Sequence, residues 1–388
     1  MKAIVLAAGE GRRLQPLTEN TPKVMLPVAN IPILHYVIDA LVSAEMRDIT
    51  IIVGYHSEKI RLYFGDGGHF GASIDYVVQE KQLGTAHALY QAKTDEETIV
   101  LPGDNIISPD CIRTIIKSPI NTILATYSRN PSKYGTLEHS RGKLIRLTEK
   151  PAGRKEDVVF TGLGHYDSKI FEYIKEALEE GIYDMTCVLN RMGPLNVKIS
   201  DCLWKDAVYP WDLLEINAWG MRSVARELSG TIEDSTIIGK VRIGEGTVIS
   251  GGTYIRGPVV IGKNCYIGPN SVILGNTSIG NDVSIGAMSF IKNSIIMPST
   301  TIRHRSDIED TVIGSGNEIG TGAVMLRSRW EKVVDGEVLS SDTGPVIGED
   351  CRIGPRVVIY PGVRISSGSR IRADSVIKED ITPREDVV

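Results

Sequence analysis

Residues 243–285 read IGEGTVISGGTYIRGPVVIGKNCYIGPNSVILGNTSIGNDVSI, and an isoleucine returns at every sixth position of this stretch. The spacing extends from Ile237 to Ile291, resumes after a slip at Ile313 and Ile319, and recurs from Ile347 to Ile377. It matches neither the period of an α-helix nor the two-residue period of a flat strand. Six-residue repeats are typical of a parallel β-helix, in which each repeat forms one short strand and one turn. We therefore predict a three-sided β-helix whose inward isoleucines stack on the residue three repeats later.

Glycine commonly follows the stacked isoleucine, as in Ile243-Gly244 and Ile261-Gly262. We expect these glycines to turn the corners of the coil with positive φ angles, which cost little only for glycine. Residues 327–345 (RSRWEKVVDGEVLSSDTGP) are polar and depart from the repeat. This departure predicts a loop that projects from one corner of the β-helix.

The composition excludes several classes of protein. The 388-residue chain has 43 lysines and arginines against 48 aspartates and glutamates, a net charge of −5, so neither nucleic acid nor an anionic membrane is indicated as a partner. No apolar run reaches the roughly 18 residues of a membrane span, and the N-terminus lacks the long apolar core of a signal peptide. The five cysteines are odd in number and form no C-x-x-C pair. We therefore expect neither a disulfide framework nor a zinc site, and a cytoplasmic protein.

The first 228 residues follow a different pattern from the repeats. Apolar strands are predicted at 2–8, 49–53, 98–101 and 122–127, and helices at 31–44, 85–93 and 169–178. This alternation predicts a Rossmann-like α/β domain with a mainly parallel sheet, whose ligands bind at the carboxyl ends of the strands. A helical segment over 212–227 connects it to the β-helix.

A glycine-rich loop follows the first strand, in the stretch Leu6-Ala-Ala8-Gly9-Glu-Gly11-Arg-Arg13. Backbone N–H groups in such a loop can surround a phosphate, because glycine lets the anion come close. Arg13, and Lys23 in the following P-K-V-M-L-P, add positive charge. The loop is not the dinucleotide pattern G-x-G-x-x-G, because Leu14 stands at the third glycine.

The combination L-A-A-G-x-G-x-R and P-K resembles the signature of sugar-1-phosphate nucleotidylyltransferases. With its C-terminal repeats, the whole chain is similar to the bifunctional bacterial and archaeal members that make UDP-N-acetylglucosamine. The resemblance implies a nucleotidyltransferase domain over 1–228 and a left-handed parallel β-helix over 229–388. It also implies Mg²⁺-dependent transfer of a nucleotidyl group from UTP or dTTP to glucose-1-phosphate or N-acetylglucosamine-1-phosphate.

The segment QEKQLGTAHA, residues 79–88, is similar to the part of the family that binds the nucleotide base. The resemblance implies nucleotide contacts from Leu6, Ala8, Gly9, Gly11, Gln79, Gln82, Gly84 and Thr85. Amide side chains suit this role because they offer both a donor and an acceptor to a pyrimidine edge. The same stretch also reads locally as a helix N-terminus capped by Thr85.

Asp104 follows an apolar strand in L-P-G-D-N, where an open α/β sheet presents its catalytic groups. The resemblance implies that this aspartate binds Mg²⁺ together with Asp206 of the W-K-D motif. Because V-Y replaces the usual Gly-Thr that follows this motif, Asp212 and Asn217 stay open as alternatives for the second ligand.

The resemblance assigns the sugar phosphate to Gly135, Glu149, Lys150 and Thr161, and the leaving pyrophosphate to Arg13 and Lys23. Both reactants are polyanions that repel each other without cations. The sugar phosphate is already ionised, so catalysis needs positioning and electrostatics rather than a general base.

Two interpretations of the β-helix stay open. His304 resembles the base of the acetyltransferase part of the bifunctional relatives, which implies acetyl-CoA as co-substrate and an amino-sugar-1-phosphate as acceptor. The match is partial, because Asp307 stands where the relatives have a tyrosine and Leu326-Arg327 where they have an asparagine. Alternatively, the β-helix only assembles a homotrimer. A third class is a regulatory protein that binds sugar nucleotides without turnover. Such a protein would lack the metal aspartate or the phosphate lysine, whereas this chain has Asp104, Lys23 and Lys150.

Overall fold

The computed structural model describes residues 1–149, 157–334, 337–382 and 386–387. The chain divides into two compact units. The first comprises Met1–Glu10, Pro22–Met25 and Ile33–Asp206, and the second comprises Gly11–Thr21, Leu26–Pro32 and Ala207–Val388. Among the described residues, no helix combines the length and the apolar character that crossing a membrane requires.

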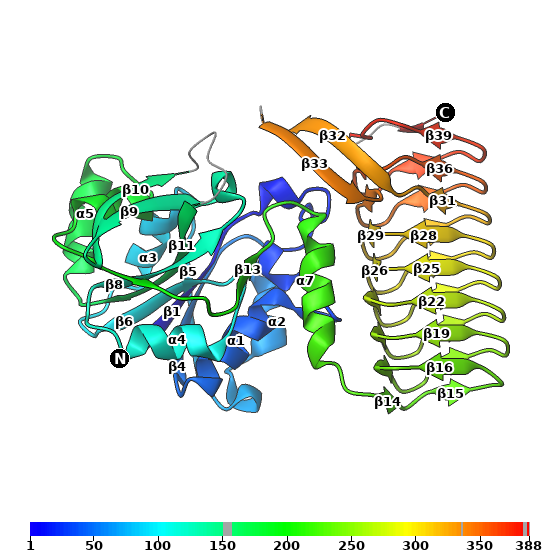
Figure 1. The fold of residues 1–388 in the computed structure, drawn as a ribbon, viewed down its shortest axis with the longest axis horizontal. Coiled ribbons are helices and arrows are strands. Elements are labelled where there is room, and N and C mark those ends of the chain that lie inside the picture. Colours follow the sequence, from blue (N-terminus) through cyan, green and yellow to red (C-terminus); the bar gives the residue numbers. More distant parts are fainter. Residues whose placement is uncertain (150–156, 335–336, 383–385, 388) are drawn as a thin grey trace. The chain divides into compact units, whose positions relative to one another are not determined.

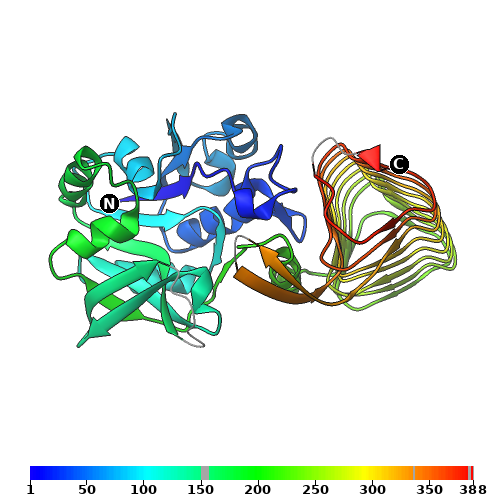
Figure 2. The ribbon, with the colours of Figure 1, turned by 90° about the horizontal axis from the view of Figure 1, so that it is seen from above.

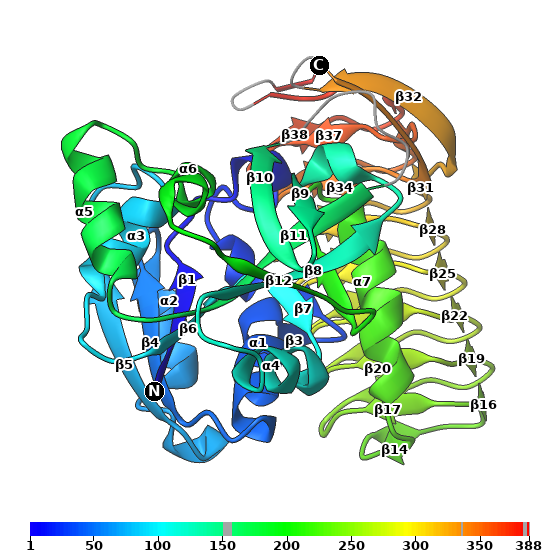
Figure 3. The same cartoon turned by 60° about the vertical axis from the view of Figure 1, so that its left-hand side comes forward.

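The first unit is built on a nine-stranded mixed sheet (Figure 3). In spatial order its strands are β5 (Ser73–Val78), β4 (Asp48–Val53), β1 (Lys2–Ala7), β6 (Thr98–Pro102), β11 (Asp157–Tyr166), β8 (Thr122–Ser128), β12 (Asn196–Ile199), β10 (Lys143–Glu149) and β9 (Gly135–Ser140). The first four are parallel, as are β8 and β12, whereas β11 runs antiparallel to both of its neighbours. The predicted α/β domain is confirmed, with a sheet that is mixed rather than mainly parallel.

Helices cover both faces of this sheet, because successive residues of a strand point to opposite sides. In β1, Ala3 and Val5 pack in one core with α1 (Ile33–Ser43), α2 (Ser57–Phe64) and α4 (Pro109–Ile116). Ile4 packs in the other core with α3 (Thr85–Gln91), α5 (Ile170–Glu179) and α6 (Met185–Arg191). This is why the strand sequence KAIVLA is apolar almost throughout instead of alternating.

Shorter elements complete the part before the repeats. They are η1 (Arg12–Leu14), η2 (Lys23–Met25), β2 (Pro27–Val28), β3 (Ile31–Pro32), η3 (Gly68–Phe70), β7 (Asn105–Ile107), η4 (Pro131–Lys133), β13 (Trp204–Asp206), α7 (Asp212–Gly220) and η5 (Met221–Ser223). Helix α7 belongs to the second unit, where Asn217 anchors it to the β-helix by accepting from Ser278 Oγ at 3.0 Å and donating to Asn276 O at 2.7 Å.

Three parallel sheets form the β-helix, with coils stacked along its axis (Figure 1) and a three-sided outline in the view along the stack (Figure 2). The first sheet is β14 (Glu227–Leu228), β17 (Val241–Ile243), β20 (Val259–Ile261), β23 (Thr277–Ile279), β26 (Ile295–Ile296), β29 (Val312–Ile313), β34 (Val346–Ile347) and β37 (Arg364–Ile365). The second is β15 (Thr231–Ile232), β18 (Val248–Ile249), β21 (Tyr266–Ile267), β24 (Ser284–Ile285), β27 (Thr301–Ile302), β30 (Glu318–Ile319), β35 (Arg352–Ile353), β38 (Arg370–Ile371) and β40 (Asp386–Val387). The third is β16 (Thr236–Ile238), β19 (Tyr254–Arg256), β22 (Val272–Leu274), β25 (Phe290–Lys292), β28 (Asp307–Glu309), β31 (Val324–Met325), β36 (Val358–Ile359) and β39 (Val376–Ile377).

The predicted isoleucine ladder forms the core of this β-helix. Ile255 pairs with Ile273, and Ile273 with Ile291, three repeats apart. The slip in the repeat is a coil shortened by one residue, because Ile279 pairs with Ile296 rather than with Met297, which lies three full repeats later. Counting strict hexapeptides therefore missed four inward residues, Ile296, Ile302, Ile308 and Met325, all of which are buried.

The reason given for the glycines after the isoleucines was wrong. Gly244 and its equivalents lie outside the positive-φ region, and a Cβ on Gly244 would lie 2.7 Å from the carbonyl carbon of Gly262 in the next coil. Glycine is required there because adjacent coils approach too closely for a side chain. Positive φ occurs two residues later, at Gly246 (φ 72°) and at the asparagine of the next coil, Asn264 (φ 55°).

Gly286→Ala is expected to destabilise the protein by about 1–3 kcal/mol, because its Cβ would overlap the backbone nitrogen of His304 in the next coil. Gly251→Ala is the matched control, since its Cβ would find no atom nearer than Asp234 O at 3.8 Å. Urea unfolding of the full chain should separate the two midpoints. Equal midpoints would contradict close coil packing as the reason for glycine.

The interruption of the repeat is a β-hairpin rather than a loop. Strands β32 (Ser328–Val334) and β33 (Glu337–Thr343) pair antiparallel. Trp330 packs edge-on against Trp211 at 4.7 Å between ring centroids, and its Nε1 donates to Thr343 Oγ1 at 3.0 Å. Arg327 fixes the base of the hairpin through ion pairs with Asp310 and Asp342.

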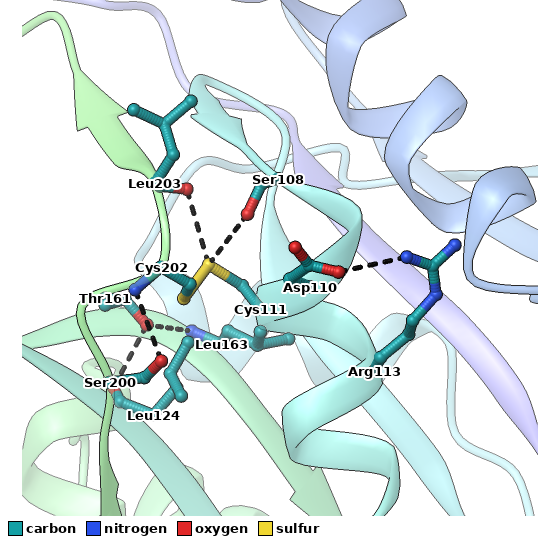
Figure 4. Close-up of a disulfide and its surroundings, with 10 residues drawn as sticks. All are labelled: Ser108, Asp110, Cys111, Arg113, Leu124, Thr161, Leu163, Ser200, Cys202 and Leu203. Atoms are coloured by element: carbon teal, nitrogen blue, oxygen red, sulfur yellow. Dashed lines mark hydrogen bonds and ion pairs between the residues drawn. A yellow bond between two sulfur atoms is a disulfide. The ribbon is translucent and has the colours of Figure 1, made fainter.

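The cysteine expectation also needs correction. Cys111 and Cys202 form a disulfide within the first unit (Figure 4), between residues too far apart in sequence for a spacing rule to find. The other three thiols are free, with Cys187 exposed and Cys265 and Cys351 buried. Burial raises the pKa of Cys265, and raises that of Cys351 to about 11.

Candidate active site

The site lies at the carboxyl ends of the parallel strands. Strand β1 lies between β4 and β6, and Gly103 N after β6 donates to Leu6 O of β1 at 2.8 Å. The strand order reverses at this point, which is where open α/β sheets bind their ligands. Gly9 therefore follows one of these strand ends and Asp104 follows the other, as the sequence predicts.

The predicted base-binding residues gather at the ends of β1, β4 and β5. A Cβ on Gly54, just after β4, would lie 2.7 Å from Gln82 Nε2 and 2.9 Å from Ala8 O. Gly54 therefore permits the close approach of Gln82 to the first loop. Gly54 was not among the predicted site residues, although a glycine directly after an apolar strand is a signal for such a close approach.

Gln79 stabilises the segment 79–88 by hydrogen bonds inside it. It is buried, and its Nε2 donates to Gly84 O at 3.1 Å and lies 2.9 Å from His87 Nδ1. A Cβ on Gly84 would overlap Tyr183 O, so this position needs glycine for close packing. Thr85 does not cap its own helix. Its Oγ1 accepts from Met185 N at 3.0 Å, at the start of α6.

Two aspartates converge on one lysine in the first unit. Lys23 Nζ lies 2.6 Å from Asp104 Oδ2 and 2.9 Å from Asp206 Oδ1. The two-stranded ribbon of β7 and β13 brings the carboxylates together, because Asp206 pairs with Asn105, the residue after Asp104. The Lys23 side chain is only 12% exposed, whereas that of Asp104 is 30% exposed, so the cluster opens to solvent on the Asp104 side.

The environment keeps Lys23 charged. Its burial opposes the charge, but the two aspartates outweigh it through Coulomb attraction and hydrogen bonds, so the pKa of Lys23 lies above its ordinary value. Two carboxylates around one ammonium ion leave the cluster with a net negative charge, so it attracts cations.

The alternative metal ligands have other partners, both within the second unit. Asp212 Oδ2 accepts from the backbone nitrogens of Val208 (3.0 Å) and Tyr209 (2.9 Å) at the start of α7. Asn217 is fully buried, and its Oδ1 accepts from Ala29 N at 2.8 Å as well as from Ser278 Oγ. Of the three candidates, Asp206 is the one whose carboxylate shares a cation with Asp104.

The donor set at Lys23 fits Mg²⁺. Both donors are carboxylates, the oxygen ligands that Mg²⁺ prefers, and they already converge on a cation. No cluster of three or more His, Cys, Asp or Glu that could hold a metal occurs among the described residues. A site with two carboxylates leaves the other coordination positions to water and substrate phosphates, as is usual for Mg²⁺.

The predicted sugar residues divide into two groups. Gly135 pairs with Glu149 across β9 and β10, and a Cβ on Gly135 would lie 3.3 Å from Glu149 Oε2, which accepts from Thr186 Oγ1 at 3.3 Å. The Thr161 side chain is buried, and its hydroxyl donates to Leu124 O at 3.0 Å, which stabilises the sheet. Lys150 lies outside the described residues.

The second half of the glycine-rich loop belongs to the second unit. Gly11 has a left-handed conformation (φ 67°), and its carbonyl oxygen accepts from Thr18 Oγ1 at 2.8 Å. Arg13 lies in η1, directly after this turn, and is exposed.

His304 lies at a pocket of the β-helix with a volume of about 750 Å³. The pocket is also lined by Arg303, Glu318, Arg352, Arg370 and Arg372. Glu318, Arg352 and Arg370 are stacked in register on successive coils. None of the four arginines has an ion-pair partner among the residues that the structure describes, so the pocket carries an excess of positive charge.

Comparison with known proteins matches three families. The Nucleotidyl transferase family matches residues 2–218, the GMPPB C-terminal domain matches 255–340, and the six-repeat bacterial transferase hexapeptide family matches 344–379. The first match covers the sheet, the base segment and both predicted metal aspartates.

Relatives align along nearly the whole chain. A Bifunctional protein GlmU from Methanococcus maripaludis is 34% identical over 93% of this chain and 90% of its own. A Bifunctional sugar-1-phosphate nucleotidylyltransferase/acetyltransferase from Sulfurisphaera tokodaii is 34% identical over 93% of both chains. A crystal structure assigned as a glucose-1-phosphate thymidylyltransferase from Bacillus anthracis, in complex with sucrose, is 30% identical and superimposes with a TM-score of 0.52 over 59% of this chain and 98% of that one.

The family matches, the full-length relatives and the two-unit architecture agree with one another. The chain therefore belongs to the nucleotidyl transferase family, among the sugar-1-phosphate nucleotidylyltransferases that carry a C-terminal hexapeptide β-helix.

Proposed function

We propose that this enzyme transfers a uridylyl or thymidylyl group from UTP or dTTP to glucose-1-phosphate or N-acetylglucosamine-1-phosphate. The cluster of Lys23, Asp104 and Asp206 at the carboxyl end of β6 carries this proposal. A phosphate oxygen of the sugar-1-phosphate attacks the α-phosphorus of the triphosphate. A new P–O bond forms, the bond to the β-phosphate oxygen breaks, and pyrophosphate leaves.

Asp104 and Asp206 would hold Mg²⁺, which would supply positive charge against the phosphates. The chain's own residues do the rest. Lys23 is held ready in the charged form and, with Arg13, neutralises the pyrophosphate that leaves. Ala8, Gly9 and Gly11 let the triphosphate approach the backbone, and Gln82 lies over the end of β4, where it can meet the base.

The sugar phosphate would bind where Gly135 meets Glu149, whose carboxylate can accept hydrogen bonds from sugar hydroxyls. Lys150, one residue further, would neutralise the sugar phosphate. Thr161, whose hydroxyl donates to Leu124 O, would support this place from strand β11. Pyrophosphate release measured over a grid of UTP and dTTP against glucose-1-phosphate and N-acetylglucosamine-1-phosphate tests the function. Absence of release with every pair, with Mg²⁺ present, would refute it.

We also propose a second activity, transfer of an acetyl group from acetyl-CoA to the amine of an amino-sugar-1-phosphate. The arginine-lined pocket beside His304 supports it, because CoA is a polyanion that such a pocket would bind. His304 would take a proton from the amine as it attacks the thioester carbonyl, and the CoA thiolate would leave.

His304→Ala is expected to lower acetyl transfer by about a hundredfold or more and to leave pyrophosphate release unchanged. The assay measures free CoA thiol with glucosamine-1-phosphate and galactosamine-1-phosphate as acceptors. Arg370→Ala is a companion variant that should raise the KM for acetyl-CoA more than it lowers kcat. If neither acceptor releases CoA thiol with the unaltered enzyme, the β-helix serves only assembly.

We propose that residues 1–228 form the nucleotidylyltransferase and residues 229–388 the acetyltransferase and assembly part of a cytoplasmic homotrimer. A column of outward apolar residues on the third sheet supports the assembly. It comprises Tyr254, Val272, Phe290, Val324, Val358 and Val376, interrupted by Asp307. Sedimentation equilibrium should give the mass of three chains.

A further inference from the structure

The disulfide Cys111–Cys202 lies in the part of the first unit that brings the two metal aspartates together. Cys111 is in α4, seven residues after Asp104, and Cys202 precedes Asp206 by four residues. Figure 4 shows the two sulfurs between α4, which carries Cys111, and the segment that carries Ser200, Cys202 and Leu203. The bond therefore closes the far end of the ribbon whose near end carries the carboxylates.

The backbone pairing within the ribbon is short. Strands β7 and β13 pair over three residues each and form a sheet separate from the nine-stranded one. One further backbone bond, Ser108 N to Leu203 O at 3.0 Å, extends the pairing toward the disulfide. The ribbon also packs on the core of the first unit through Ile107 and Trp204, and Asn105 Nδ2 donates to Thr161 O at 3.1 Å. The disulfide is the covalent link among these contacts.

Asp206 is also the last residue of the first unit, because the chain enters the second unit at Ala207. Upstream, Ser200 N donates to Ala125 O at 3.0 Å, the last backbone bond to the main sheet before the ribbon. Within its unit, the ribbon and the ion pair with Lys23 position Asp206, and the disulfide ties the chain down four residues upstream. The two carboxylates repel each other whenever Lys23 does not neutralise them, so the ribbon bears that repulsion.

We propose that Cys111 and Cys202 are positioning residues for the metal site, and that their disulfide holds Asp206 at the distance from Asp104 that a divalent cation requires. The role of this positioning in catalysis rests on the proposed function. The effect of the disulfide on metal binding can be measured without it. Cys111 is buried and Cys202 is partly exposed, so a small dithiol can reach the bond from the Cys202 side.

Reduction is a balanced exchange. The dithiol gives two electrons and two protons, the S–S bond becomes two thiols, and the reagent closes to a cyclic disulfide. Reoxidation reverses the change. The same molecule can therefore be measured in both states, which avoids reliance on a variant that could fail to fold.

The proposal is tested directly by titrating the protein with Mn²⁺ alone and measuring binding by electron paramagnetic resonance. Reduction is expected to raise the dissociation constant of Mn²⁺ about tenfold, the usual effect of losing support for a metal ligand, and reoxidation should restore it. The double variant Cys111→Ala with Cys202→Ala should match the reduced protein. Asp206→Asn identifies the site, because it should lose this Mn²⁺ signal in either state.

Ile115→Val is the matched control, since it removes a buried methylene from the same helix, α4, and leaves the ribbon intact. It should lower stability without changing Mn²⁺ affinity. In the enzyme assay, reduction should raise the Mg²⁺ concentration for half-maximal turnover and leave the KM for sugar-1-phosphate unchanged.

Equal Mn²⁺ affinity in the oxidised and reduced states would overturn the inference, whatever the activity. A redox-dependent affinity in a protein without pyrophosphate release would support the positioning role and refute the proposed function. The two failures are therefore distinguishable.

Discussion

Asp206→Asn is expected to lower kcat for pyrophosphate release by about a hundredfold or more at saturating substrates, because one of the two carboxylates that would hold Mg²⁺ becomes neutral. The substitution keeps the size of the side chain and lets its oxygen still accept from Lys23. The loss should therefore come from charge rather than from packing. Raising Mg²⁺ should recover part of the activity, since metal affinity falls as well.

Asp212→Asn is the control for this result. Its Oδ2 accepts from two backbone N–H groups, which an amide oxygen can also do. Turnover and the Mg²⁺ requirement should stay near those of the unaltered enzyme. If Asp212→Asn rather than Asp206→Asn raised the Mg²⁺ requirement, the assignment of the second ligand would move to α7.

Lys23→Ala is expected to lower kcat by about a hundredfold and to change the KM for sugar-1-phosphate little, because its ammonium stabilises charge that develops on the leaving pyrophosphate. The Mg²⁺ requirement should not rise, because Lys23 and a metal ion compete for the same carboxylate oxygens. Added Mg²⁺ should therefore recover part of the turnover of Asp206→Asn but not that of Lys23→Ala.

Lys2→Ala removes the same charge from the opposite end of a site strand and serves as the matched control. Lys2 begins β1 and forms ion pairs with Asp48 and Asp75 near its start, away from the carboxyl ends. Steady-state kinetics should show nearly unchanged kcat. Loss of turnover in Lys2→Ala equal to that in Lys23→Ala would indicate a general charge effect and contradict the specific role.

The parts of the fold with a periodic signal could be predicted from sequence. The isoleucine ladder shows its period directly, and the apolar segment 2–8 matches β1 within one residue. Ile302 and Ile308 were missed because a coil shortened by one residue changes the phase, which a strict count cannot follow. The corner glycines show that the same residue type can satisfy two requirements, positive φ or close approach, that sequence does not distinguish.

The sequence motifs predict which residues belong to the site, but not which of these residues form ion pairs with one another. The motifs name Lys23, Asp104 and Asp206, yet their shared ion pairs depend on the ribbon of β7 and β13, whose strands lie far apart in sequence. The Cys111–Cys202 disulfide was missed for the same reason. The cysteine pattern therefore no longer argues for a reducing cytoplasm, where disulfides are rare outside hyperthermophiles.

The distribution of free thiols makes the oxidised protein suitable for labelling at one chosen position without mutation. Cys265 and Cys351 are buried with raised pKa values, so a maleimide should react at Cys187, which is exposed on α6. Its neighbour Thr186 donates to Glu149. A fluorophore on Cys187 would therefore report occupancy beside Glu149, in real time and without any enzymatic turnover.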